Sequence, residues 1–264
     1  MIAATMIDAK LYIIPLSIVW IATAVALVVL PGSVLLGWVP ADLLSLAEAR
    51  ATWQQLIPYA SHTASWVAVG STVGLIGAIV LLRMKVLPLS FAEEIELPEG
   101  ADPDDPDLMV AHPHPRREVG KEVLFLMLPM LGAALGYGAS VLVDASGQGH
   151  PVWHVIGGVL LGYLVGGGVV WVTRILGTLA FGKEAMGLGD VHLMAAVGAV
   201  IGWRDTTLAF FIAPFFGIAA VVIQMGVTAL IKKRHSPIPY GPYLCGAAVV
   251  VMVWRQPIFD TIFP

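Results

Sequence analysis

Two aspartates that adjoin long apolar runs are the residues of this chain best placed for chemistry. Asp190 closes the motif Gly187-Leu188-Gly189-Asp190, and Asp8 precedes the first apolar run. An ionised carboxylate beside hydrocarbon is costly, so a membrane chain that keeps one there usually uses it. Glycine has no side chain to obstruct an approaching peptide, so we expect Gly187 and Gly189 to contact the substrate.

Two carboxyl groups that meet in a partly dry site cannot both ionise, so they share one proton. One then acts as a general base on a water molecule while the other acts as a general acid toward a peptide carbonyl, without a metal or another cofactor. We expect Asp8 and Asp190 to form this catalytic pair. Glu184 is an alternative candidate to Asp190 because it lies nearby in the sequence, but it follows Lys183 and is expected in water.

The composition is that of an integral membrane protein. The 264 residues are 58% hydrophobic and 12% charged, whereas a soluble domain carries about 25% charged residues. The net charge is -4, and no basic stripe suggests a nucleic-acid partner. The one cysteine, Cys245, excludes an internal disulfide and a cysteine-based zinc site.

Apolar windows long enough to cross about 30 Å of hydrocarbon predict an all-α, polytopic fold with about seven transmembrane helices. The expected spans are 11–30, 65–83, 122–143, 152–173, 187–203, 206–231 and 238–254, of which the fifth is short. We expect residues 1–264 to form a single membrane domain in the lipid bilayer.

For a chain in the cell inner membrane, the basic residues predict a cytoplasmic N-terminus. With that orientation eleven basic residues fall in cytoplasmic segments, and only Arg50, Arg204 and Arg255 fall on the other side. Range 31–64 is then a non-cytoplasmic loop, in which residues 41–60 fit an interfacial amphipathic helix or an ordinary loop helix equally well.

Range 84–121 is expected to be a cytoplasmic acidic loop. It holds eight acids between Glu93 and Asp107 without an intervening base, together with several prolines. This composition favours a solvated linker, while attraction of basic substrate segments is the sharper alternative. Two histidines in the loop, His112 and His114, are too few ligands to predict a metal site.

Glycines recur at four-residue spacing in two expected spans. They are Gly132 and Gly136 in one, and Gly158, Gly162 and Gly166 in the next. This spacing places them on one helix face, where a neighbouring helix can approach closely. We therefore interpret them as packing residues, and we interpret the run 166–168 as packing or a flexible point rather than a phosphate cradle.

Three motifs resemble those of the type IV prepilin peptidases, a family of polytopic GxGD aspartic proteases. The first is Asp8-x6-Pro15, the second is Gly-Lys-Glu-Ala-Met-Gly-Leu-Gly-Asp-Val-His-Leu at 182–193, and the third is Ile-Pro-Tyr-Gly-Pro-Tyr at 238–243. The resemblance covers the first motif and roughly residues 155–250. It implies cleavage of the leader of prepilin or pseudopilin-like substrates at the cytoplasmic face, with Asp8 and Asp190 catalytic.

Three departures accompany this resemblance. No Cys-x-x-Cys set precedes Asp8, so the cysteine-containing methyltransferase region of many relatives is not expected here, and either this is a peptidase-only form or the N-terminus has been lost. Leu16 and His192 stand where the family usually has Asp or Asn and Lys. The two aspartates are 182 residues apart, which an inserted pair of spans, 65–83 and 122–143, would explain.

Two other functions fit the same sequence. A proton-coupled membrane transporter would use two intramembrane acids as a proton relay and glycine-rich spans as hinges. A non-catalytic partner of a pilus or secretion assembly would keep the motifs without activity. The sequence does not predict an oligomeric state.

Overall fold

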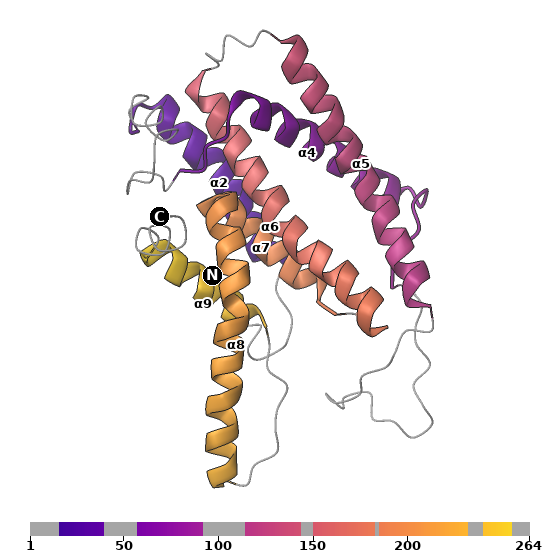
Figure 1. Cartoon of the computed structure of the whole chain (residues 1–264). Helices are drawn as coiled ribbons and strands as arrows, with labels where there is room; N and C mark the ends of the chain where they lie inside the picture. The colour runs from indigo at the N-terminus through magenta and orange to yellow at the C-terminus, as the bar shows by residue number, and fades with distance from the viewer. Residues whose placement is uncertain are drawn as a thin grey trace.

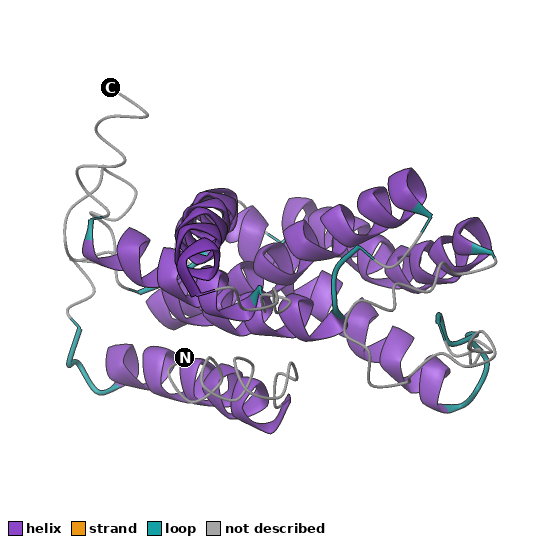
Figure 2. Cartoon of the chain, turned by 90° about the horizontal axis from the view of Figure 1, so that it is seen from below, coloured by secondary structure: helices purple, strands orange, loops and turns teal. Residues whose placement is uncertain are grey.

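The computed structural model describes residues 16–39, 57–91, 114–143, 150–182, 185–231 and 240–254, and the side chains of 16 and 227–231 are excluded. The described helices are α2 (Leu16–Leu35), α4 (His62–Arg83), α5 (Pro115–Leu142), α6 (Pro151–Phe181), α7 (Leu188–Ile201), α8 (Trp203–Ile231) and α9 (Gly241–Val253). No strand occurs within these ranges, as Figure 2 also shows. Each helix overlaps one of the seven expected spans, so the all-α, polytopic prediction is confirmed.

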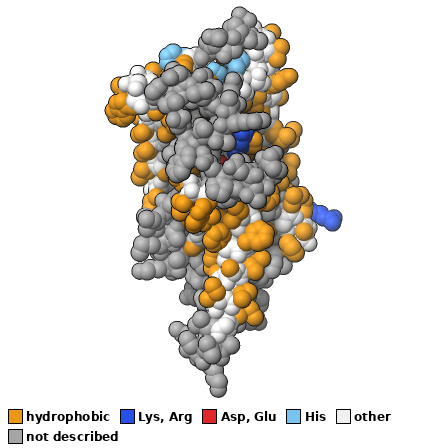
Figure 3. Space-filling view, turned by 60° about the vertical axis from the view of Figure 1, so that its left-hand side comes forward, with side chains coloured by type: hydrophobic (Ala, Val, Ile, Leu, Met, Phe, Trp, Pro, Cys, Tyr) orange, Lys and Arg blue, Asp and Glu red, His pale blue; other side chains and the backbone are white. Residues whose placement is uncertain are grey.

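The chain is a multi-pass membrane protein. Five of the described helices are long and apolar enough to cross a bilayer, namely α2, α4, α5, α6 and α8, while α7 and α9 are shorter apolar helices. Apolar side chains cover most of the described surface in Figure 3, and Lys and Arg occur there only at isolated positions. A surface of this kind suits hydrocarbon as the surrounding solvent.

Local sequence signals explain where several helices begin and end. The Ser61 hydroxyl accepts a hydrogen bond from the backbone N–H of Ala64 at the start of α4. Proline at the first turn begins both α5 and α6, because its missing N–H costs nothing at that position. Gly182 ends α6 with φ of 71°, a left-handed conformation that suits glycine.

Several helix bounds differ from those expected, and the two largest differences are in α5 and α6. Helix α5 begins at Pro115, so residues 115–121 are helical rather than part of an acidic loop over 84–121. Helix α6 continues to Phe181, eight residues past the expected end of its span. The acidic block 93–107, His112 and most of the segment 41–60 lie outside the described residues.

Close glycine contacts join the helices in antiparallel pairs. A Cβ atom placed on Gly162 in α6 would lie 2.0 Å from the carbonyl oxygen of Gly198 in α7. One placed on Gly132 in α5 would lie 2.1 Å from the carbonyl oxygen of Gly70 in α4. Only glycine permits backbones to approach this closely, so the interpretation of Gly132 and Gly162 as packing residues is confirmed. Packing does not extend to Gly168, where an added Cβ atom meets none of the described residues within 4 Å.

Helix α2 lies along the α6–α7 pair and runs parallel to α7. Near its beginning, Val19 shares a buried cluster with Val191 and Leu193; further along, Ala26 shares another with Ala199. The N-terminal ends of α2 and α7 therefore lie at the same end of the bundle. The α4–α5 pair flanks α6 on its other side, and the second half of α8 extends beyond the other helices (Figure 1).

Candidate active site

Asp190 lies in the first turn of α7, where the sequence places it beside exposed backbone N–H groups. Gly187 caps the helix with extended backbone, φ of -72° and ψ of 147°. The backbone N–H of Asp190 donates to the carbonyl oxygen of Gly187 at 3.2 Å. The positive end of the helix dipole favours a carboxylate at this position. Asp190 is half-buried, so its carboxyl group borders both protein and open space.

The backbone beside Asp190 is open on the glycine side. Gly187 is exposed, and a Cβ atom placed on it would meet the Asp190 carboxylate oxygen Oδ2 only at 3.9 Å. Among the described residues, no other side chain comes within 4 Å of that position. An extended peptide has room to approach the carboxyl group over Gly187.

The beginnings of α2 and α7 are in side-chain contact. The rings of Trp20 and His192 lie 6.1 Å apart between centroids, and Trp20 also lies 6.5 Å from the ring of Tyr163 in α6. The structure thus brings the helix that follows Asp8 beside the helix that carries Asp190. Asp8 itself and Glu184 lie outside the described residues, so the expected carboxyl pair stays a prediction.

Tyr240 brings the third sequence motif to the same region. It caps the N-terminus of α9 and packs, with Met186, against the core cluster that includes Val191. Burial raises the pKa of the Tyr240 phenol, and the negative charge of Asp190 raises it further. The two side chains are therefore close enough to interact electrostatically. Ile238 and Pro239 lie outside the described residues.

An ion pair between α5 and α6 was not anticipated from the sequence. Arg174 donates from Nε to Oε1 of Glu122 at 2.9 Å, and both side chains are almost completely buried. Arg174 therefore lies inside the bundle rather than in a cytoplasmic segment, where the charge count placed it. The sequence did contain a signal for this ion pair: Glu122 and Arg174 carry opposite charges at the borders of apolar spans, and buried charges in membranes are usually paired.

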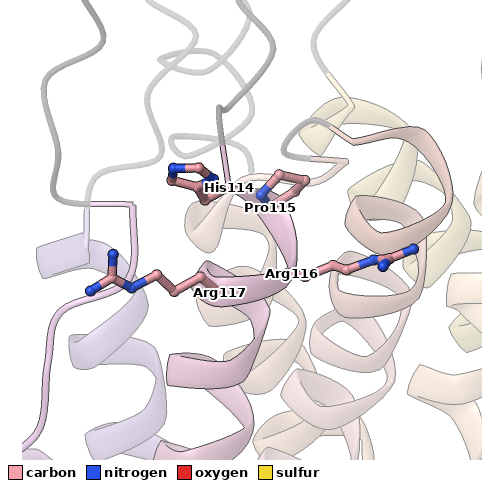
Figure 4. Close-up of a pocket in the computed structure, with 4 residues that line it drawn as sticks. All are labelled: His114, Pro115, Arg116 and Arg117. Atoms are coloured by element: carbon pink, nitrogen blue, oxygen red, sulfur yellow. The ribbon is translucent and has the colours of Figure 1, made fainter.

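No metal centre is formed by the part of the chain that the structure describes, where no three His, Cys, Asp or Glu side chains converge. A hollow at the start of α5 is lined by His114, Pro115, Arg116 and Arg117. The side chains of Arg116 and Arg117 point away from each other in Figure 4. This hollow therefore lacks converging donors, and Asp190 is not among the residues that line it.

Residues 121–222 match the model of the type IV leader peptidase family. The prepilin leader peptidase/N-methyltransferase of Aeromonas salmonicida is 32% identical over 134 residues, which are 50% of this chain and 42% of that protein. Its counterpart in Aeromonas hydrophila is 34% identical over 136 residues, with the same coverage. The counterpart in Pseudomonas aeruginosa is 34% identical over 104 residues, 39% of this chain and 34% of that protein. No solved structure matches the chain significantly.

These matches correct the interpretation of span 122–143 as an insertion, and they cover only part of the chain and of its relatives. The family match begins at residue 121, so α5 belongs to the shared region and the span 122–143 is not part of an insertion. The matched part of the chain spans 42% of the Aeromonas relatives. The motifs around Asp8 and at 238–243 lie outside the matched residues 121–222.

Proposed function

We propose that this chain, whose residues 121–222 match the model of the type IV leader peptidase family, is a membrane aspartic endopeptidase. Its substrates are prepilin or pseudopilin-like precursors, from which it removes the leader peptide. The observation that supports the proposal is the parallel packing of α2 and α7, because the helix that follows Asp8 contacts the helix that carries Asp190.

The proposed reaction is a hydrolysis in which Asp8 and Asp190 share one proton. The ionised carboxyl group takes a proton from a water molecule, and the resulting hydroxide attacks the peptide carbonyl. The protonated carboxyl group donates its hydrogen to the carbonyl oxygen as charge develops there. Collapse of the tetrahedral intermediate then breaks the C–N bond, and the amine leaves with a proton from the pair.

Gly187 and Gly189 are proposed to bind the backbone of the substrate. The leader enters at the open side of Gly187, while the apolar helix of the precursor lies in the bilayer. Because neither glycine carries a Cβ atom, the peptide can lie flat against the start of α7. The substrate carbonyl then comes within reach of Asp190.

We place this site at the cytoplasmic face of the inner membrane, with the N-terminus of the chain on that side. Among the described residues, Arg83, Lys85, Arg116 and Arg117 lie at helix ends on the same side of the bundle as Asp190, whereas Arg204 lies at the opposite side. Excess Lys and Arg marks cytoplasmic segments. Within a single membrane domain of residues 1–264, the acidic loop then faces the cytoplasm, where it meets the leader.

The test is cleavage of a co-purified prepilin by the chain in detergent. Asp8→Asn and Asp190→Asn are each expected to reduce kcat by about 10²–10⁴-fold, because each removes a proton-transfer group. Asp205→Asn is the matched control, since Asp205 also lies in the first turn of its helix but at the opposite end of the bundle.

Full cleavage by either substituted enzyme contradicts the proposal. Cleavage that proceeds in detergent without a transmembrane gradient separates a peptidase from a proton-coupled transporter. A folded wild-type chain that cleaves no pilin-like precursor would support the non-catalytic assembly partner instead.

A further inference from the structure

Arg174 connects three parts of the chain through contacts buried inside the bundle. Its Nε donates to Oε1 of Glu122 in α5 at 2.9 Å, and its Nη1 donates to the carbonyl oxygen of Met186. Its guanidinium also lies 4.9 Å from the centroid of the Phe91 ring. Residue Arg174 is 1% exposed, so these contacts are shielded from water.

Glu122 is held in turn by other donors. The indole N–H of Trp171 donates to its Oε2 at 3.0 Å, and the hydroxyl of Ser90 lies 3.5 Å from its Oε1. Removal of one partner from a buried ion pair leaves an uncompensated charge and is costly. The contacts of Glu122 therefore fix where the Arg174 side chain lies, and hence which backbone carbonyl it reaches.

That carbonyl belongs to the residue just before the candidate site. Met186 precedes Gly187, and Gly187 caps the helix whose first turn contains Asp190. A shift of the Met186–Gly187 peptide would move the start of α7 and the Asp190 carboxyl group with it. The Arg174 contact thus acts on the site without touching it.

A second contact holds the same segment against α6. The backbone N–H of Ala185 donates to the Thr178 hydroxyl at 3.4 Å. A Cβ atom on Gly177 would lie 2.5 Å from the Cβ atom of Ala185, so the segment packs directly on the helix. Residues 185 and 186 are therefore held by consecutive turns of α6. Among the α6 residues Arg174, Gly177 and Thr178, only Arg174 is a charged donor.

We propose that Arg174, held by Glu122, is a positioning residue that fixes the Met186–Gly187 peptide and so orients Asp190 for catalysis. The proposal rests on the peptidase function proposed above. Arginine suits this role because its planar guanidinium presents several N–H donors at fixed angles, so one side chain serves Glu122 and Met186 together. Lysine is a compact charge on a flexible stem and would not hold both partners in the same geometry.

Arg174→Lys in the full-length chain separates positioning from stability. We expect the protein to fold, because the charge opposite Glu122 remains, and we expect kcat to fall about 10–100-fold, since small misplacements of catalytic groups have effects of this size. The KM for the precursor should not change, because Arg174 does not contact substrate. Arg204→Lys is the matched control: this arginine also lies over an aromatic ring, that of Trp203, but at the opposite end of the bundle.

A charge exchange gives the sharper result. Arg174→Glu combined with Glu122→Arg restores opposite charges between α5 and α6, but a carboxylate at position 174 cannot donate to the Met186 carbonyl. We expect this double variant to melt closer to wild type than either single variant does, while its kcat stays at least tenfold below that of wild type. Recovery of wild-type kcat by the exchange would overturn the proposal, because the ion pair would then only join two helices.

A readout without substrate keeps the inference independent of the peptidase assignment. In a Cys245→Ala background, Ala185→Cys carries a nitroxide spin label on the segment beside Met186. Its mobility should increase when Arg174→Lys is added and stay the same when Arg204→Lys is added. Unchanged mobility overturns the positioning role even if the wild-type chain proves inactive, whereas an inactive wild type with increased mobility overturns only the peptidase function.

Discussion

The helix pairs α4–α5 and α6–α7 are closed by the same kind of contact but differ in what surrounds them. In each pair, glycine backbones meet so closely that an added Cβ atom would lie 2.0–2.3 Å from a carbonyl oxygen of the partner helix. Helix α6 has 44% of its apolar window buried, whereas α4 and α5 have 17% each. The α4–α5 pair is peripheral, while the α6–α7 pair also contacts α2, α8 or α9.

This difference teaches that close glycine packing does not by itself mark a functional site. We call each line of glycine contacts between two paired helices a seam. Both seams satisfy the general need of membrane helices to gain van der Waals contact. Only the α6–α7 pair also carries an aspartate at a helix start and a backbone segment held by a buried arginine. The chemistry therefore follows from the polar residues at the end of the pair, and the glycines serve to fix the two helices relative to each other.

Gly198→Ala should have the largest effect. The new Cβ atom would lie 2.0 Å from the Gly162 carbonyl oxygen, so the backbones must separate. We expect the free energy of unfolding to fall by about 3 kcal/mol or more, at the upper end for overpacked cores. Because α7 also carries Asp190, kcat per folded molecule should fall as well. Thermal unfolding in detergent and precursor cleavage measure the two quantities, and loss of stability with unchanged kcat would contradict a link between seam and site.

Gly132→Ala applies the same steric change to the peripheral pair. Its Cβ atom would lie 2.1 Å from the Gly70 carbonyl oxygen. We expect a loss of about 1–3 kcal/mol in the free energy of unfolding, with kcat per folded molecule unchanged. The same two assays apply. A fall in kcat as large as that of Gly198→Ala would remove the distinction between the two pairs.

Gly187→Ala tests the open side of the site without disturbing a seam. Its backbone conformation suits any residue, and the nearest atoms to the new methyl group would be 3.9 Å away. Stability should stay at the wild-type level. We expect kcat/KM for a prepilin to fall about tenfold, which corresponds to ~1.4 kcal/mol, because the methyl group occupies space that the substrate backbone needs. Unchanged kcat/KM would remove Gly187 from the substrate-binding surface.

Gly168→Ala provides the smallest effect and the control for the others. Gly168 lies in α6 beside two glycines that pack against α7, yet a Cβ atom placed on it meets nothing within 4 Å. Alanine favours a helix over glycine, so the free energy of unfolding should stay constant or rise by up to about 1 kcal/mol. Gly166→Ala, whose Cβ atom would lie 2.3 Å from the Met194 carbonyl oxygen, should be destabilising in the same melting assay.

The sequence predicted the helices well because the bilayer imposes a simple length and polarity rule. Apolar windows located all seven described helices, and glycine spacing identified the faces that pack. The predicted helix ends were less accurate, because hydropathy does not report on first-turn prolines or on buried ion pairs. Helix α5 begins earlier than expected because Pro115 suits a first turn, and α6 continues past Arg174 because a partner in α5 neutralises that charge.

The candidate site was predicted in part. A pair formed by Asp8 and Asp190 requires the helices that follow or carry them to meet, and the packing of α2 on α7 agrees with that requirement. The catalytic roles of Asp8 and Asp190 and the substrate-binding roles of Gly187 and Gly189 all stay predictions. The contact between Arg174 and the Met186 carbonyl could not be predicted, since nothing in local sequence specifies which backbone group a buried guanidinium will reach. Glu122 and Arg174 are 52 positions apart, and only tertiary packing brings them together.

Helix α7 has a consequence for the lipid around it. Its 14 residues rise only about 21 Å, whereas the hydrocarbon core of a bilayer is about 30 Å thick. If its far end near Gly202 is level with one headgroup layer, Asp190 is recessed beneath the other. Water must then descend to the carboxyl group, or the membrane must thin locally to meet it. Because α7 is short, access of water to this site depends on the acyl-chain length of the surrounding lipid.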